Sequence, residues 1–206
     1  YERLAAQAGR QRPPGSYSAI WLDQPPARLV GLFRQILPEA KRAGVLLGPD
    51  SSAQLPALRA AAGRARLELV VETVAGEQDV MPALARLLPA ADGLLAVPDG
   101  VVYRRETVRG ILLSTYRHQK PLVAFSQSYV NAGAIAAAFS TPALAALQAA
   151  ELVRALPAGK FALPPPQPPA YPSVAINRQV ARSLGLDPPA DALVQKAVER
   201  AAENER

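Results

Sequence analysis

Short apolar segments alternate with amphipathic segments along most of this chain. Apolar runs of the kind found in buried parallel strands occupy residues 44–48, 67–74, 93–97 and 121–125. Apolar side chains recur at helical spacing between these runs, in residues 53–65, 80–88 and 107–118. A strand and a helix alternating about every 25 residues are the signature of βαβ units. The pattern therefore predicts an α/β fold with a Rossmann-like parallel sheet.

Residues 17–52 show the pattern most clearly. We predict a short strand at 18–22 and then a helix, because Pro25 and Pro26 suit the first helical turn. Asp23, just upstream, is a candidate N-cap for that helix. The apolar face of the helix consists of Leu29, Leu32, Phe33, Ile36 and Leu37. We expect the helix to continue past Pro38 and to end near Lys41, Arg42 and Gly44.

The last third of the chain is less regular. We predict a strand at 133–139, a helix at 143–156 that Thr141 and Pro142 begin, a strand at 173–177, a helix at 178–184 capped by Gly185, and a final helix at 191–203. The proline-rich residues 159–172 cannot form a helix or a central strand, so we expect an extended crossing on the surface. At the other end, residues 1–8 predict a helix and 9–16 a connector.

Composition narrows the possible functions. The 206 residues are 50% hydrophobic and contain no cysteine, which excludes disulfides and thiolate metal sites. The net charge of +6 raises nucleic acid as a partner, but the basic residues are scattered, so no nucleic acid is expected. No apolar run approaches the roughly 18 residues of a membrane helix, and no signal peptide begins the sequence. The single histidine, His118, lies in the polar end of a predicted helix and is expected on the surface.

Several longer motifs resemble one known family. They are Asp-Gln-Pro at 23–25, LPEAKR at 37–42, GVLLGPDSS at 44–52, ADGLLAVPDGVVY at 91–103, KPLVAFSQSYVNAGAIAAAFSTP at 120–142 and SVAINRQVARSLGL at 173–186. In this order they are similar to ABC-transporter substrate-binding proteins with the type I periplasmic-binding fold. That family includes binders of tryptophan and related amino acids. The resemblance covers nearly the whole chain.

The resemblance also implies a division into two lobes, of which the first is incomplete. Members of the family have roughly 90 to 100 further residues before the position of Tyr1, an ordinary α/β domain size, so a truncated or proteolysed chain is expected. Residues 1–22 would end the first lobe and begin the hinge, 23–126 would form the second lobe, 127–140 would return to the first lobe, and 141–206 would complete the second. Hinge crossings are expected near Leu22, near 126–132 and near Ser140. We expect weak ligand binding and dimerisation through the exposed first-lobe edge.

Ligands in open α/β sheets bind beside the carboxyl ends of the strands. The polar residues predicted at these ends give the candidate ligand contacts, which are Asp23, Gln24, Ser51, Ser52, Gln54, Asp99, Tyr103, Ser126 and Tyr129. Ser51 and Ser52 precede a helix, whose free N–H groups could hold a carboxylate, although plain N-capping explains them equally well. Asp99 could instead be a turn residue before Gly100, and Tyr129 could be ordinary packing.

The resemblance assigns more specific roles to some of these residues. It places Ser51, Ser52 and Gln54 against a ligand carboxylate and Asp23 against a ligand ammonium, with N-capping as the alternative for Asp23. Asp99 matches a frequent polar contact, and Tyr103 would supply a ring wall. Trp21 is expected to pack at the hinge.

The family implies a solute-binding component of an ABC importer that captures an amino acid or similar ligand in the periplasm and delivers it to an ABC permease. A sensing module of the same fold, coupled to a membrane kinase or receptor, is the alternative. A nucleotide-handling enzyme is a third possibility, but the sequence has no Gly-rich phosphate loop, no G-x-S-x-G and no metal-binding histidines. No catalytic residue, cofactor or metal is therefore expected. A structural or interaction role remains if the cleft is blocked.

Overall fold

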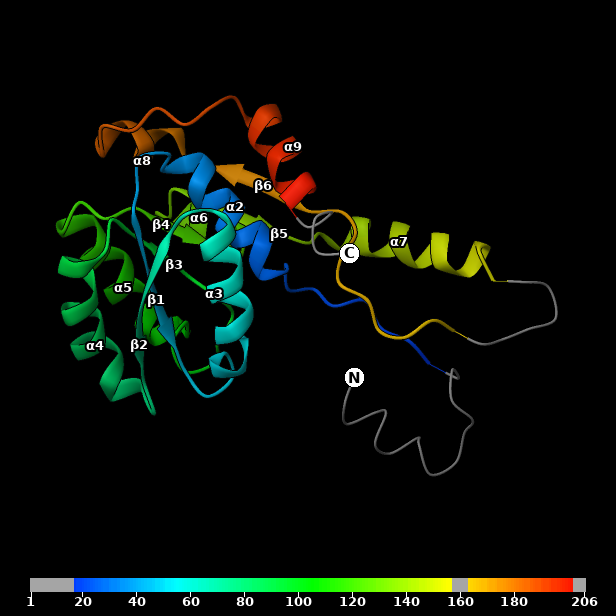
Figure 1. Cartoon of the computed structure of the whole chain (residues 1–206), viewed down its shortest axis with the longest axis horizontal. Coiled ribbons are helices and arrows are strands. Elements are labelled where there is room, and N and C mark those ends of the chain that lie inside the picture. The colour runs from blue at the N-terminus through cyan, green and yellow to red at the C-terminus, as the bar shows by residue number, and fades with distance from the viewer. Residues whose placement is uncertain (1–16, 157–162, 202–206) are drawn as a thin grey trace.

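The computed structural model describes residues 17–156 and 163–201, and its centre is a 6-stranded sheet (Figure 1). The strands are β1 (Arg42–Leu47), β2 (Glu68–Thr73), β3 (Gly93–Leu95), β4 (Leu122–Ala124), β5 (Ala136–Phe139) and β6 (Ser173–Ile176). Their order is β2-β1-β3-β4-β5-β6, and all neighbours are parallel except β5 and β6. The predicted α/β fold is confirmed.

Helices cover both faces of the sheet. They are α2 (Pro26–Ile36), α3 (Leu55–Arg64), α4 (Glu77–Ala90), α5 (Arg105–Arg117), α6 (Gln127–Ala132), α7 (Pro142–Arg154), α8 (Arg178–Ser183) and α9 (Asp191–Ala201), with a short 3-10 helix, η1 (Ser52–Gln54), before α3. Alternate residues of β1 point to opposite faces: Val45 and Leu47 pack with α2, α3 and α9, whereas Leu46 packs with α4 and α5. Burial on both faces explains why the strands are continuously apolar.

The first and last helices of the described sheet region pack against each other. Within one of the two apolar cores, α2 lies beside α9, which brings together two helices that are far apart in the sequence. The contact is close, because a Cβ added to Gly31 would lie 3.0 Å from the Cβ of Ala201. A small residue at position 31 allows the two helices to approach this closely.

Helix α2 differs from its prediction at both ends. It begins after Pro25, and within the described residues no side chain caps it, so the prediction that Asp23 is the N-cap is wrong. It ends at Ile36 rather than near Lys41, because Leu37 precedes Pro38 and a residue before proline disfavours helical backbone angles. Leu37 has φ −126° and ψ 72°, well outside the helical region.

Two other segments also differ from expectation. Residues 18–22 form no regular strand, although Ile20 makes an isolated parallel bridge with Gln167. Residues 127–140, expected to return to a first lobe, contain α6 and β5 instead, and β5 belongs to the same sheet as the other strands. Short helices between parallel strands are easily missed when the sequence offers only a polar corner and an apolar run.

A second part of the chain extends away from the sheet. In Figure 1, α7 projects from the sheet-containing body, and the extended residues 17–25 and 163–172 run on the same side. The start of α7 follows its prediction, since Thr141 Oγ1 accepts a hydrogen bond from the Leu144 N–H at 3.2 Å. Several side chains on α7 are exposed, including Leu147 at 44% and Val153 at 63%.

Most of the other local predictions are confirmed. Residues 163–172 are extended, Gly185 ends α8 with a positive φ of 69°, and His118 is exposed. The predictions for residues 1–16, 159–162 and 202–203 lie outside the described residues. Within the described ranges, no helix has the length and apolar character needed to cross a membrane.

Candidate functional site

The carboxyl ends of β1, β3 and β4 lead into neighbouring loops at one edge of the sheet. The β1 loop contains Ser51, the β3 loop contains Asp99 and Tyr103, and β4 leads to Phe125 and Ser126. This edge is where a ligand binds in folds of this type. These polar residues therefore follow the strands much as the sequence predicted.

Asp99 joins the first two of these loops. One carboxylate oxygen, Oδ2, accepts hydrogen bonds from the Asp50 N–H at 3.2 Å, the Ser51 N–H at 3.0 Å and the Ser51 hydroxyl at 2.7 Å. The other, Oδ1, accepts from the Val101 N–H at 2.8 Å and the Val102 N–H at 3.0 Å. The second pair belongs to a local turn, which supports the interpretation of Asp99 as a turn residue.

The charge of Asp99 is stabilised by these contacts. Burial by itself raises the pKa of this carboxyl, but hydrogen bonds from the Val102 N–H, the Ser51 hydroxyl and the Val101 N–H outweigh it. The net effect is a pKa below the ordinary value of 3.8. Asp99 is therefore an anion at neutral pH, although only 7% of its surface is exposed.

Ser51 is completely buried and faces this carboxylate. Its hydroxyl also accepts a hydrogen bond from the Gly48 N–H at 3.0 Å. The sequence suggested that the N–H groups of this corner are free to hold a ligand carboxylate. In the structure, the carboxylate of Asp99 occupies that place. Ligand contact by Ser51 stays a prediction, and a ligand would have to compete with Asp99.

Glycines allow the two loops to approach this closely. A Cβ added to Gly48 would lie 2.4 Å from Oδ1 of Asp99, and one added to Gly100 would lie 2.9 Å from Oδ2 of Asp50. Asp50 Oδ2 also accepts a hydrogen bond from the Gly100 N–H at 3.0 Å. The loops are therefore connected by paired contacts in both directions.

An aromatic cluster follows the polar contacts along the same edge. The ring centroids of Tyr103 and Phe125 are 5.6 Å apart, those of Phe125 and Tyr129 are 4.9 Å apart, and the Tyr103–Tyr129 pair is edge-on at 6.2 Å. The Tyr129 hydroxyl donates to the backbone oxygen of Tyr103 at 2.8 Å. Phe125, expected only as a core residue, thus joins two predicted site residues.

The two tyrosine hydroxyls have different environments. Burial raises the pKa of Tyr129 to about 12 and raises that of Tyr103 further. The Tyr103 hydroxyl is buried and has no hydrogen-bond partner among the described residues. A buried hydroxyl without a partner costs about 1–3 kcal/mol, so it is a contact that an additional polar group would satisfy.

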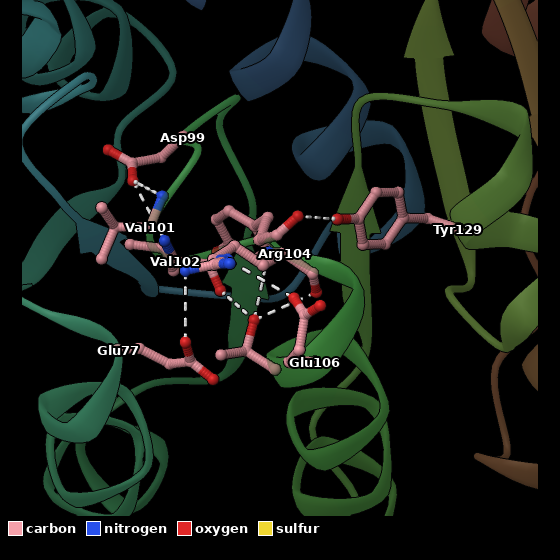
Figure 2. A network of polar contacts seen from close by, with 9 residues as sticks. Glu77, Asp99, Val101, Val102, Arg104, Glu106 and Tyr129 are labelled. Atoms are coloured by element: carbon pink, nitrogen blue, oxygen red, sulfur yellow. Dashed lines mark hydrogen bonds and ion pairs between the residues drawn. The ribbon is translucent and has the colours of Figure 1, made fainter.

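A surface ion-pair cluster lies beside the β3 loop. Figure 2 shows Asp99 and Tyr129 on opposite sides of this loop, with Arg104 near Glu77 and Glu106. Arg104 Nη1 lies 3.2 Å from Glu77, and its Nε lies 3.4 Å from Glu106. All three side chains are well exposed, so these ion pairs contribute little to stability. The Thr107 hydroxyl, in the first turn of α5, stabilises the loop by donating to the Val102 oxygen at 2.7 Å.

The remaining predicted contacts are not gathered around Asp99. Ser52 is exposed and Gln54 half-buried in η1, while Ser126 is half-buried before α6. Asp23 is exposed, and partial desolvation by the surrounding protein raises its pKa. Gln24 is only 5% exposed, and its side-chain amide donates to the Ser140 hydroxyl at 2.8 Å.

Sequence reasoning missed Arg28, which is only 4% exposed and hydrogen-bonds to Gln24. A usable signal was present, because Arg28, Leu32 and Ile36 are spaced four residues apart and therefore share the buried face of α2.

Grooves also exist elsewhere, one of about 500 Å³ between α4 and α5 and one of about 460 Å³ beside α5 and α8. Neither is lined by a predicted site residue.

The family model for ABC transporter substrate binding proteins matches residues 23–200, which is most of the chain. The chain belongs to this family. The match covers the whole sheet and all three strand-end loops, and it confirms the resemblance seen in the sequence motifs. No curated protein matches the chain.

Solved structures agree with the family assignment. A conserved domain protein from Vibrio cholerae O1 biovar El Tor is 25% identical with a TM-score of 0.69, and the match covers 86% of this chain. An ABC domain from Streptococcus pneumonia, solved in complex with L-Trp, is 18% identical with a TM-score of 0.66 over 84% of this chain. An open, ligand-free substrate-binding protein with adhesive properties from Clostridium difficile is 17% identical with a TM-score of 0.69 over 91%.

This member of the substrate-binding family spans only part of the length of these similar structures. It covers 61%, 59% and 65% of the three solved chains, in the same order. The last two are distant in sequence, so they support the fold alone. The sheet with its covering helices corresponds to one lobe of a periplasmic binding fold, and α7 with the extended segments lies beyond it.

Proposed function

We propose that this chain is the solute-binding component of an ABC importer and that it captures an amino acid or similar zwitterion. The family match supports a role in substrate binding. The complex of a structural neighbour with L-Trp supports an amino acid as the ligand class. The observation that carries the proposal is the convergence of three strand ends on one edge, where Asp99 makes the loops rigid before any ligand arrives.

The proposed contacts fall into two groups. The first contains exposed or half-buried side chains, together with Tyr103, whose buried hydroxyl has no partner among the described residues. These would meet the ligand directly: Asp23, Ser52, Gln54, Tyr103, Ser126 and Tyr129. The second contains Gln24, Ser51 and Asp99, whose polar groups bind one another or neighbouring loops. We propose that the main role of these three is to hold the first group in position, and that direct contact with the ligand is their secondary role.

The chemistry of the first group fits a zwitterion with an apolar side chain. Asp23 carries an exposed carboxylate whose charged form has lost part of its hydration, so a ligand ammonium nearby would lower its free energy. Ser52 and Gln54 offer neutral hydrogen-bond donors for a carboxylate. The rings of Tyr103 and Tyr129 provide an aromatic wall with polar edges. Nothing in this set transforms the ligand.

The proposed partner is an ABC permease, and the proposed location is the periplasm. Both come from the family and not from a described contact. Two-lobed closure around the ligand would present a different surface to the permease in the bound and free states. Neighbouring genes would test this proposal, because permease and ATPase genes indicate import whereas a kinase gene indicates sensing.

A thermal-shift titration tests ligand capture. The 206-residue chain is heated with L-tryptophan, with other amino acids, with purines and with sugars, each at high concentration because binding by this portion is expected to be weak. Binding to the folded state raises the melting temperature by mass action, so a rise for one amino-acid class is expected. Asp23→Asn should abolish that rise, whereas Asp187→Asn, which changes an exposed carboxylate in the loop before α9, should preserve it. A folded chain that responds to no amino acid contradicts the proposal.

A further inference from the structure

Three segments of the chain leave the sheet-containing body on the side from which α7 projects. They are residues 22–24, residues 140–141 and residues 168–170, which are far apart in sequence (Figure 1). Four side chains connect them, and we call these the crossing network: Gln24, Arg28, Ser140 and Gln148. Gln24 and Gln148 are each 5% exposed and Arg28 is 4% exposed, so most of the network is out of contact with water.

Arg28 binds two of the crossing segments at once. Its Nη1 donates to the side-chain oxygen of Gln24 at 2.9 Å and to the backbone oxygen of Pro169 at 2.6 Å. Its Nη2 donates to the backbone oxygen of Ala170 at 2.8 Å. Because Arg28 lies in the first turns of α2, it also fixes both segments to the helix that packs on the sheet.

The third crossing segment is connected through Ser140. The Gln24 side-chain amide donates to the Ser140 hydroxyl at 2.8 Å, and that hydroxyl donates to the backbone oxygen of Leu22 at 2.8 Å. From the other side, Gln148 of α7 donates to the Pro168 oxygen at 3.1 Å and accepts from the Ala170 N–H at 2.8 Å. Segment 168–170 therefore lies between a side chain of α2 and a side chain of α7.

The sequence explains why side chains are needed here. Residues 163–172 are mostly proline, which has no N–H group, so this segment cannot pair with another strand along a regular ladder. It offers carbonyl oxygens instead. A guanidinium carries five N–H donors in a fixed plane and reaches several carbonyls at once, which the ammonium group of lysine cannot reproduce.

From this geometry we propose that Arg28 is a positioning residue that holds the three crossing segments together, so that they move as one body. We call this role the hinge pin. The pin sets the orientation of α7, and of any lobe that packs on it, relative to the ligand-binding edge of the sheet. The consequence for ligand capture rests on the function proposed above. The mechanical role of Arg28 does not, because it concerns contacts present without ligand.

Amide hydrogen exchange on the 206-residue chain tests the pin without any ligand. Arg28→Lys should make the amides of Trp21 and Ala170 exchange at least about tenfold faster, whereas the amide of Val45 inside β1 should keep its protection. Trp21 is the only tryptophan in the chain and is 41% exposed, so its fluorescence gives a second local signal.

Arg34→Lys is the matched control. Arg34 lies on the same helix and also donates to several backbone oxygens, including those of Ala40 and Ala65, but both acceptors lie within the sheet-containing body. It should leave exchange at Trp21 and Ala170 unchanged. Unchanged exchange in Arg28→Lys, or an equal loss of protection at Val45, overturns the proposal.

A milder variant decides the matter if Arg28→Lys does not fold. Ser140→Ala removes one hydroxyl and should speed exchange at Trp21. The Ala170 amide should keep its protection, because both Arg28 and Gln148 still bind segment 168–170. Ser183→Ala removes a comparable hydroxyl bond within α8 and should change neither amide. Identical exchange in the two serine variants overturns the proposal.

Discussion

The hydroxyl oxygen of Ser51 lies 2.7 Å from a carboxylate oxygen of Asp99, although 48 positions separate the two residues in the chain. This contact joins the loop after β1 to the loop after β3. It connects two strand-end loops at the edge where ligands bind in this fold.

Asp99→Asn should destabilise the chain by about 2–3 kcal/mol, because hydrogen bonds to a charged group are strong and an amide cannot accept at both positions. The Ser51 and Val102 N–H groups would compete for the single remaining carbonyl oxygen. Urea unfolding followed by circular dichroism measures the loss. Asp187→Asn, an exposed carboxylate, serves as the control and should change stability little. Equal midpoints for the two variants would contradict the structural role of Asp99.

The same carboxylate should make stability depend on acid pH. Its pKa is lowered in the folded state, so the stabilisation is fully present above the unfolded value, near 3.8, and is lost as pH falls through the lower folded value. Unfolding free energy measured from pH 6 downward should therefore decline below about pH 4. Asp99→Asn should show a shallower decline over this range. A decline of equal steepness in both proteins would show that Asp99 is not responsible.

Gly48→Ala and Gly63→Ala should have opposite effects. A Cβ at position 48 would lie 2.4 Å from Asp99, and relieving that overlap should cost about 1–3 kcal/mol. At position 63, inside α3, a Cβ meets no atom within 4 Å, and alanine should stabilise the helix by up to about 1 kcal/mol. Chemical denaturation of both variants tests the pair, and similar unfolding midpoints would refute the close approach of the two loops.

Removing single hydroxyls should distinguish the two tyrosines. Tyr129→Phe deletes the 2.8 Å hydrogen bond to the Tyr103 oxygen and should cost about 1 kcal/mol. Tyr103→Phe deletes a buried hydroxyl without a partner among the described residues and should stabilise the free chain by about 1 kcal/mol. Thermal unfolding without ligand measures both. If Tyr103→Phe lowers the melting temperature as much as Tyr129→Phe does, the Tyr103 hydroxyl has a partner in solution.

Exposed apolar side chains on α7 should promote self-association. Leu147 is 44% exposed and Val153 is 63% exposed on this helix. Light scattering should show a mass that rises with concentration, and Leu147→Lys should reduce the rise. Leu193→Lys changes a residue on α9 that is 61% exposed and should leave association unaltered. A monomeric mass at every concentration would contradict this prediction.

The sheet could be predicted from sequence because its strands are short apolar runs between turn residues. The periodicity located β1 to β4 within a few residues, and it also gave the start of α7 at Thr141 and Pro142. The end of α2 could have been predicted as well, since the rule for the residue before Pro38 is local. Helix α6 was missed because its sequence, QSYVNA, carries no clear helical period.

The site was harder, because its important contacts join distant parts of the chain. Nothing in the sequence around Ser51 indicates that Asp99 accepts a hydrogen bond from its backbone N–H group. Nor does the charge of Arg28 indicate that it binds carbonyl oxygens of a proline-rich segment 141 residues away. Residue types and strand ends did predict that polar residues follow β1, β3 and β4 at one edge of the sheet. The individual roles of the nine residues predicted there stay predictions.

The packing of α2 on α9 also governs when this chain can fold during synthesis. Helix α9 is synthesised about 160 residues after α2, and Gly31 of α2 packs against Ala201 of α9. While the ribosome is still translating, the apolar face of α2 lacks that cover, and one edge of the sheet waits for β6. A nascent chain that stalls before α9 would therefore expose the apolar face of α2 to chaperones and proteases.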